Sequence, residues 1–260
     1  MENLGVLGAV IAAVLLAVIV VGFVRYQIGL AGVTEAMVDA EEALDAGDVE
    51  RARTLMAPLL ARFPKLAVVQ EVSADVLYAA GDPLSAASLW EQAMKKLGAP
   101  RVAPRLTAAY TALNRPGDAR RVAALVPEDT LARVTIAWCE LAAIGGDREK
   151  GRALADEIAH DDVLRATPSG DAMASALCAI AQGNAGERSA MRESIAGVRR
   201  RMDELAAHDR AFVGYLVGVA QREGGAAEDA RATWTGAMEI APQSIGAALA
   251  RRERSHLPAG

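Results

Sequence analysis

Two patterns of apolar and polar positions divide the chain. Residues 4–24 form one unbroken apolar run, LGVLGAVIAAVLLAVIVVGFV, which contains no charged or strongly polar side chain. From residue 33 onward, apolar residues recur at helical spacing between charged ones, and we find no long alternating run of Val, Thr and Tyr that would predict a strand. The pattern therefore predicts an all-α protein, with one N-terminal transmembrane helix followed by amphipathic helices.

The apolar run has the length of a membrane span. At about 1.5 Å per residue, its 21 residues cover about 30 Å, the thickness of a bilayer hydrocarbon core. Phe23, Arg25 and Tyr26 follow at its C-terminal edge, where aromatic and cationic side chains suit the interface. A cleavable signal peptide is the alternative, but residues 1–3 lack Lys and Arg and no convincing cleavage site follows. We predict an anchor over residues 1–26 and a linker over residues 27–32.

Small residues line one face of the predicted membrane helix, namely Gly5, Gly8, Ala9, Ala12, Ala13 and Ala17. Such a face lets a second helix approach closely in lipid. We expect it to pack against another membrane helix, and the alternative is the ordinary Gly and Ala content of an anchor. We expect an inner (cytoplasmic) membrane protein. Arg25 is the one side chain near the span to which the positive-inside rule applies, and it favours a C-terminal domain in the cytoplasm, with the periplasm as the alternative.

A repeat of 34 residues begins after the linker. ALDAGDVERARTLMAPLLARFP, from Ala43, aligns with LYAAGDPLSAASLWEQAMKKLG, from Leu77, and the pattern returns near the C-terminus as EGGAAEDARATWTGAMEIAP. In each copy a Gly is followed by an Ala five residues later and by a bulky residue four further on. These residues are Gly47, Ala52 and Met56; Gly81, Ala86 and Trp90; and Gly225, Ala230 and Trp234.

Each position of this signature has a physical reason. The Gly tolerates the left-handed conformation that ends the first helix of a hairpin. The Ala lies where the second helix crosses the first, and a larger side chain would push the two apart. The bulky residue fills the groove between neighbouring helices. Weaker copies over residues 114–119, 146–158 and 183–195 extend the pattern, which predicts about six hairpins over residues 33–243 and a capping helix and tail over residues 244–260.

The signature resembles that of the tetratricopeptide repeat family. The chain as a whole resembles a membrane-anchored, bacterial-type member of that family. The early Trp and the later Leu-Gly and Tyr of that family's first helix are mostly missing, because Ala36, Asp39, Ala40 and Ala43 occupy those places in the first unit. The resemblance implies an α-solenoid whose first helices form a concave groove for peptides or partner domains. Candidates for that groove are Leu77, Tyr78, Tyr110, Glu140 and Tyr215, and the partner-binding residues themselves stay unknown.

Composition and charge narrow the chemistry. The chain is 52% hydrophobic but only 4% aromatic, which favours helices packed through small side chains. Its net charge of −5 argues against nucleic-acid binding, because binding the phosphates needs a basic surface. The basic clusters at residues 120–121, 199–201 and 251–254 are interpreted as solvated helix faces, and contact of the last cluster with anionic lipid is the alternative.

No motif points to catalysis. Cys139 and Cys178 lie far apart without a metal-binding spacing, so we interpret them as small buried side chains, with a disulfide as the alternative. The histidines, His160, His208 and His256, have no neighbours at metal or triad spacing. We therefore expect no catalytic, cofactor-binding or metal-binding residue and no small-molecule substrate.

These patterns favour a non-catalytic, membrane-tethered scaffold for protein–protein interaction. We expect it to be an accessory or structural subunit of a larger membrane complex, whose partners are integral membrane proteins and the lipid bilayer. The alternative is a membrane-anchored assembly or quality-control factor that binds client proteins transiently.

Overall fold

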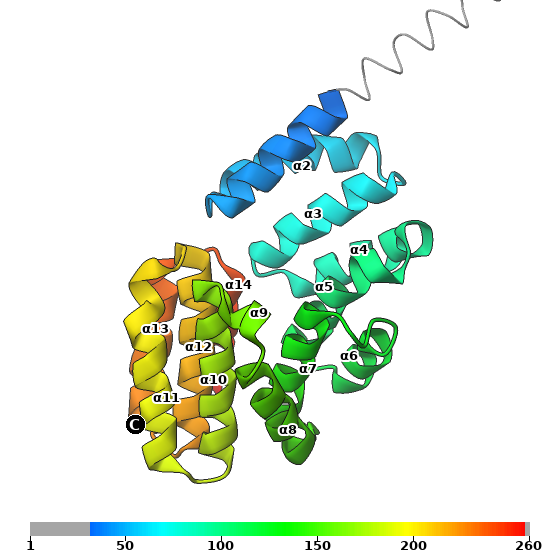
Figure 1. Ribbon diagram of the computed structural model, residues 1–260. Helices are drawn as coiled ribbons and strands as arrows, with labels where there is room; N and C mark the ends of the chain where they lie inside the picture. The colour runs from blue at the N-terminus through cyan, green and yellow to red at the C-terminus, as the bar shows by residue number, and fades with distance from the viewer. Residues whose placement is uncertain (1–31, 258–260) are drawn as a thin grey trace, which may run out of the picture.

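The computed structural model describes residues 32–257, which are built from helices and their connecting turns (Figure 1). The all-α prediction is confirmed for this part of the chain. A helix over residues 32–45 precedes the others, which are α2 (Val49–Arg62), α3 (Ala67–Ala79), α4 (Pro83–Leu97), α5 (Ala99–Ala112), α6 (Pro116–Ala123), α7 (Thr130–Ala142), α8 (Arg148–Ala159), α9 (Asp162–Arg165), α10 (Pro168–Asn184), α11 (Arg188–Arg201), a 3-10 turn (Met202–Glu204), α12 (Ala207–Glu223), α13 (Ala227–Ile240) and α14 (Ile245–His256).

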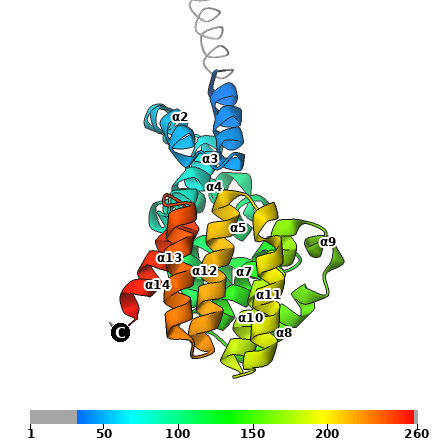
Figure 2. The same ribbon diagram turned by 90° about the vertical axis from the view of Figure 1, so that its left-hand side faces the viewer.

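The helices follow one another as hairpins, as the repeat predicted. Within the described residues there are six: the helix over residues 32–45 with α2, then α3 with α4, α5 with α6, α7 with α8, α10 with α11, and α12 with α13. The first helices of successive hairpins also pack on each other from α5 through α7 and α10 to α12, and α14 follows them. Figure 2 shows α11, α12, α13 and α14 side by side in the C-terminal half.

The predicted membrane anchor lies outside the described residues, and so does its small-residue face. Among residues 32–257, no helix is both long enough and apolar enough to cross a bilayer. Gly32 is the only residue of the predicted linker that the structure describes, and it is helical.

The strongest turns have the chemistry that the repeat signature suggested. Gly47, Gly81 and Gly225 have φ angles of 77°, 79° and 79°, which a side chain would strain. After the first two of these glycines, an Asp starts the second helix: the Asp48 carboxylate accepts a hydrogen bond from the Arg51 N–H, and Asp82 accepts one from Ser85. The Gly-Asp pair therefore ends one helix and begins the next within two residues.

The fifth copy, over residues 183–195, is displaced from its expected place. The fifth turn is centred on Gly186, with φ of 74°, and Gly183 lies inside α10. A Cβ on Gly183 would come within 2.7 Å of the Ala220 carbonyl oxygen, so this glycine lets α10 approach α12. The expectation that Gly183 begins the turn is therefore wrong. The short helix α9 and the 3-10 turn add residues around α10 and α11, which is why the 34-residue period fades there.

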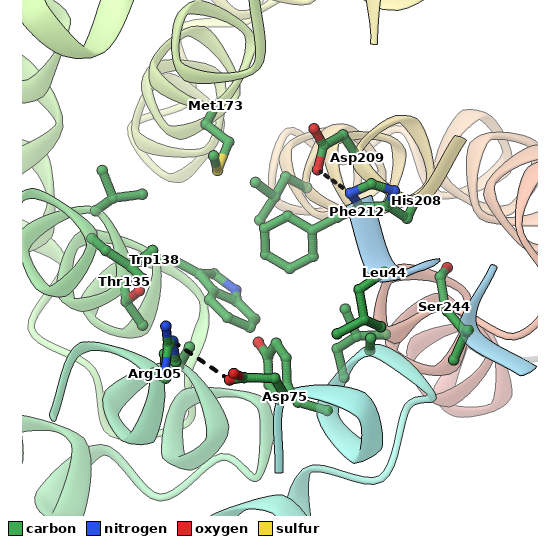
Figure 3. A pocket seen from close by; sticks show the side chains of 18 of the residues that line it. Leu44, Asp75, Arg105, Thr135, Trp138, Met173, His208, Asp209, Phe212 and Ser244 are labelled. Atoms are coloured by element: carbon green, nitrogen blue, oxygen red, sulfur yellow. Dashed lines mark ion pairs between the residues drawn. The ribbon is translucent and has the colours of Figure 1, made fainter. Parts of the chain in front are cut away.

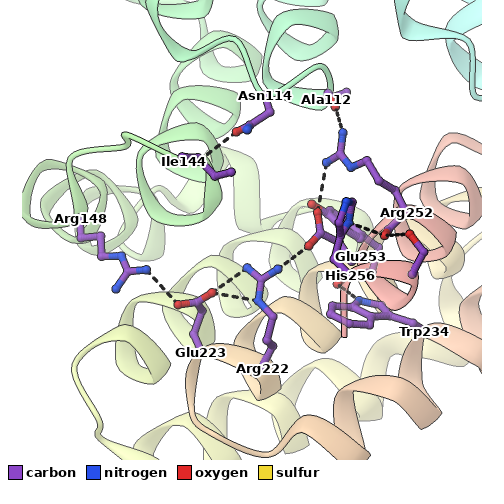
Figure 4. A network of polar contacts seen from close by, with 12 residues as sticks. Ala112, Asn114, Ile144, Arg148, Arg222, Glu223, Trp234, Arg252, Glu253 and His256 are labelled. Atoms are coloured by element: carbon purple, nitrogen blue, oxygen red, sulfur yellow. Dashed lines mark hydrogen bonds and ion pairs between the residues drawn. The ribbon is translucent and has the colours of Figure 1, made fainter. Parts of the chain in front are cut away.

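The last helix also contacts the N-terminal half of the described chain. A Cβ on Gly81, at the tip of the second hairpin, would lie 2.7 Å from the Cβ of Ala248 in α14. Arg252 donates a hydrogen bond to the Ala112 carbonyl, and its neighbour Glu253 pairs with Arg222 of α12 (Figure 4). Arg252 and Glu253 therefore face other helices, whereas Arg251 and Arg254 of the same cluster are exposed, as a solvated helix face requires.

Candidate functional site

The first helices of the hairpins surround a cavity of about 370 Å³. All six first helices among the described residues contribute to its lining, and the start of α14 closes it on one side. We call it the central cavity, and its lining consists of Leu44, Asp45, Val49, Asp75, Tyr78, Ala79, Trp90, Arg105, Ala108, Leu131, Val134, Thr135, Trp138, Met173, Leu177, His208, Asp209, Phe212, Leu216, Ser244 and Ile245. Its volume falls within the range of roughly 300–1,000 Å³ that is usual for ligand pockets.

Aromatic and aliphatic side chains form the middle of the central cavity. The rings of Trp138 and Phe212 meet edge to face, with centroids 5.3 Å apart, and Tyr215 supports Trp138 from behind at 5.9 Å. Figure 3 shows Met173 and Leu44 on other sides of the same space. Edge-to-face pairs of this kind hold the rings in place, so the apolar wall is preformed.

Charged groups stand on one side of this apolar middle, where α3 faces α5. Glu71 and Asp75 are four residues apart on α3, and Arg101 and Arg105 are four apart on α5. Arg101 and Arg105 both bind the buried Glu71 carboxylate, at 2.7 and 2.8 Å, while Arg105 Nε lies 3.5 Å from Asp75 (Figure 3). The two arginines are therefore engaged mainly by Glu71, and Asp75 is the less satisfied carboxylate.

Burial raises the pKa of Asp75 from 3.8 to about 7. Arg105 opposes this shift, and the carboxylates of Glu71 and of Glu41, on the first helix, add to it. The indole of Trp90 has a smaller, opposing effect. Near neutral pH the central cavity therefore contains a carboxyl group that takes up or releases a proton.

This shift predicts a pH-dependent stability that Asp75→Asn should remove. The folded protein holds the Asp75 proton more tightly than the unfolded chain, so stability should fall as pH rises from 3.8 to about 7 and then level off. Between pH 5 and pH 8 the loss should be about 2 kcal/mol, because about two of the three pKa units of the shift lie above pH 5 and partial exposure reduces the effect. Thermal unfolding of the wild type and of Asp75→Asn at pH 5 and pH 8 measures it. The exposed Asp156→Asn is the control, and an equal pH response of the wild type and Asp75→Asn would contradict the assignment.

A second polar group stands on the opposite side of the central cavity, at the start of α12. His208 Nε2 lies 3.3 Å from an Asp209 oxygen, and the Ser169 hydroxyl donates to the other oxygen at 2.9 Å. The Nδ1 atom of His208 is buried without a hydrogen-bond partner in the described part of the chain. Figure 3 shows this pair across the aromatic rings from Asp75 and Arg105.

The groove candidates chosen from the sequence are divided between this cavity and other places. Tyr78 lines the central cavity, and Tyr215 lies behind its wall. Leu77 packs in the hydrophobic cluster around Trp90. Tyr110 hydrogen-bonds Glu91 away from the cavity, and Glu140 is fully buried against Arg120. Of the five groove candidates, Tyr78 alone is part of the cavity lining.

The repeat-signature residues form the core between helices. Ala52, Ala86 and Ala230 are completely buried, and Met56, Trp90 and Trp234 occupy the equivalent positions nine residues after each Gly, all at most 2% exposed. Trp90 also lines the central cavity.

The cysteines are both free, so the disulfide alternative is not supported. Cys139 is buried and Cys178 is half-buried. Of the histidines, only His208 lines the central cavity. Residues 32–257 contain no cluster of His, Cys, Asp and Glu that could hold a metal ion.

Asp75, Arg105, His208 and Asp209 were not selected from the sequence. A usable signal was present for the first two: an acidic pair at a spacing of four lies in the apolar stretch of residues 67–79, and an arginine pair at the same spacing follows one helical hairpin later. His208-Asp209 carried no such signal, because a His-Asp pair before an apolar helix is equally consistent with a turn.

No protein-family model matches this chain, and no curated protein matches it. The tetratricopeptide resemblance therefore remains a prediction. The central cavity is the feature from which a function can be inferred.

Proposed function

We propose that the chain is a membrane-tethered, non-catalytic scaffold of tetratricopeptide type that holds a partner protein in its central cavity. The observation that carries the proposal is that the first helix of every described hairpin lines this one cavity. A surface built jointly from six repeats suits recognition of a segment of another protein, because each repeat adds a few side chains to a continuous interface.

Two further observations support the family and the tether. The glycines at positions 47, 81 and 225 adopt the left-handed conformation, and the alanines five residues later are completely buried, as a tetratricopeptide hairpin requires. The apolar run over residues 4–24 is long enough to span a bilayer. We place the protein in the inner membrane, with the repeat domain on the cytoplasmic side, as an accessory subunit of a membrane complex.

Extraction of the full chain from its native membrane in a mild detergent, followed by mass spectrometry, tests this proposal. We expect one stoichiometric set of integral membrane proteins to co-purify. A broad, substoichiometric set of clients would instead indicate transient binding during assembly or quality control, and recovery of the chain alone would contradict both functions.

The same purification tests the predicted packing face of the anchor. Ala9→Leu with Ala13→Leu should release the chain from its complex, because the larger side chains block close helix approach. The matched control is Ile11→Leu with Val18→Leu, which changes apolar residues on the opposite side of the same helix. Unchanged co-purification of the Ala9→Leu, Ala13→Leu variant would mean that this face makes no contact.

A further inference from the structure

A buried indole N–H group stands beside the apolar middle of the central cavity. Trp90 is only 1% exposed and lines the cavity, and its Nε1 faces the Asp75 carboxyl without completing a hydrogen bond to any described residue. A buried N–H group is costly to leave unpaired, so a ligand that brings a carbonyl oxygen would fit here. Peptide backbones bring such an oxygen at every residue.

The charges around the same space favour a cation. The lining contains three carboxylates, Asp45, Asp75 and Asp209, against the guanidinium of Arg105 and the imidazole of His208. Arg105 is already bound by the buried Glu71, and His208 faces Asp209. The lining therefore has more negative than positive charge available to a ligand.

Asp45 is a candidate ligand-binding residue, because a carboxylate at its position does not stabilise its own helix. It is the last residue of the helix over residues 32–45, and it is exposed at the edge of the central cavity. A carboxylate at a helix C-terminus is unfavourable, because the carbonyl end of the helix dipole is itself negative. Asp209, by contrast, lies in the first turn of α12, where an acidic side chain also stabilises the helix.

We propose that the central cavity binds an apolar segment of the partner protein that carries a lysine or arginine. The apolar side chains pack against Trp138, Phe212 and Leu177, a backbone carbonyl accepts the Trp90 N–H, and the cation faces Asp45 and Asp75. The inference rests on the proposed scaffold function and adds the chemistry of the segment that is held.

Ionisation of Asp75 supplies an independent signature of this binding. A cation placed beside a carboxyl group with a raised pKa favours its charged form, so binding near pH 7 should release a proton from the protein. The groups that face Asp75 in the free protein are Arg105, Glu71, Glu41 and Trp90. Calorimetry in two buffers of different ionisation enthalpy measures the proton released.

The test uses the full chain in lipid nanodiscs, which avoids detergent in the apolar cavity, and three probe peptides. They are acetyl-Gly-Leu-Phe-Lys-Leu-Gly-amide and its relatives with norleucine or glutamate in place of lysine. Binding is followed by the fluorescence of the tryptophans in the cavity wall. We expect the lysine peptide to bind about tenfold more tightly than the glutamate peptide, with the norleucine peptide between them.

Variants locate the site. Asp45→Asn with Asp75→Asn should reduce the preference for lysine over glutamate to about threefold or less. The control, Asp156→Asn with Asp203→Asn, replaces the same number of carboxyl groups at exposed positions outside the cavity and should leave the tenfold preference unchanged. Ala108→Phe, which adds a ring to the lining, should weaken binding of all three peptides.

Three outcomes would overturn the inference: equal affinity for the three peptides, tighter binding of the glutamate peptide, or no binding by a protein with wild-type helicity. These failures are distinct from failure of the scaffold function. If a stoichiometric membrane complex is recovered but the peptides do not discriminate, the scaffold stands and the cavity chemistry is wrong. If the peptides discriminate but no complex is recovered, the cavity chemistry stands and the scaffold function is wrong.

Discussion

Replacing Gly218 by alanine should destabilise the protein by about 3 kcal/mol or more, although alanine is the better helix former. Gly218 lies in the middle of α12, directly under the indole of Trp234. A Cβ there would come within 2.5 Å of the indole Cδ1 and 2.7 Å of Cε2, and would also overlap Nε1. Trp234 cannot move aside cheaply, because it is fully buried and its Nε1 donates to the Tyr215 carbonyl at 3.0 Å.

Gly236→Ala is the matched control for this prediction. Gly236 lies inside the neighbouring helix α13, and a Cβ there would meet no atom within 4 Å. The same substitution should therefore stabilise the protein by about 0.5–1 kcal/mol, through helix propensity alone. Thermal unfolding of the full chain in mild detergent, followed by tryptophan fluorescence, compares the two. If both variants shift the midpoint in the same direction, the packing of Trp234 on Gly218 is not what limits stability.

This pair of glycines illustrates how far the sequence predicts the fold. Trp234 was placed in the core because it lies nine residues after Gly225, as Trp90 does after Gly81, and both are buried. Gly218 has no place in the repeat signature, and nothing in the sequence distinguishes it from Gly236. Local spacing predicts which residues of a hairpin face inward, whereas close contact between two helices depends on their crossing point, which only the folded chain defines.

The central cavity was predictable to a similar degree. The resemblance to a known repeat placed a groove on the first helices, and Tyr78 does line the cavity. Asp75 and Arg105 could have been found from their paired spacing on successive first helices. The contribution of α14 could not, because it depends on the curvature accumulated over six hairpins, which brings Ser244 and Ile245 to Leu44 and Tyr78. Small rotations between repeats add up over the array and are not encoded at any one position.

The polar core contains a second element that the repeat pattern did not predict. Glu140, on α7, is completely buried. Arg120 of α6 binds it with two nitrogens, at 2.7 and 2.5 Å, and the Asp147 N–H donates to it at 2.7 Å. One carboxylate therefore joins the third hairpin to the fourth and also fixes the turn that begins α8.

Arg120→Ala should destabilise the protein by about 3 kcal/mol at pH 7, since it leaves a buried carboxylate without its main partner. This is the lower end of the range for breaking a buried pair, because Arg120 is itself partly exposed and the Asp147 N–H remains. Arg121→Ala is the matched control on the same helix. Arg121 is exposed and pairs with Asp118 at the surface, so its loss should leave the unfolding midpoint almost unchanged.

The pH dependence of stability in the wild type and in Arg120→Ala should distinguish loss of the Arg120–Glu140 ion pair from a simple packing defect. Burial raises the pKa of Glu140, but the bonds from Arg120 and Asp147 outweigh it and hold the pKa below 4.5. In the wild type, the stability that Glu140 contributes is therefore present above pH 4.5 and lost as the pH falls through its lowered pKa. Without Arg120, burial dominates and raises the pKa, so the variant gains stability as acid protonates Glu140. The deficit of Arg120→Ala should accordingly be largest at pH 7 and shrink towards pH 4, and thermal unfolding across that range measures it. A deficit that stays constant with pH would mean that Arg120 acts through packing of its aliphatic stem and not through its charge.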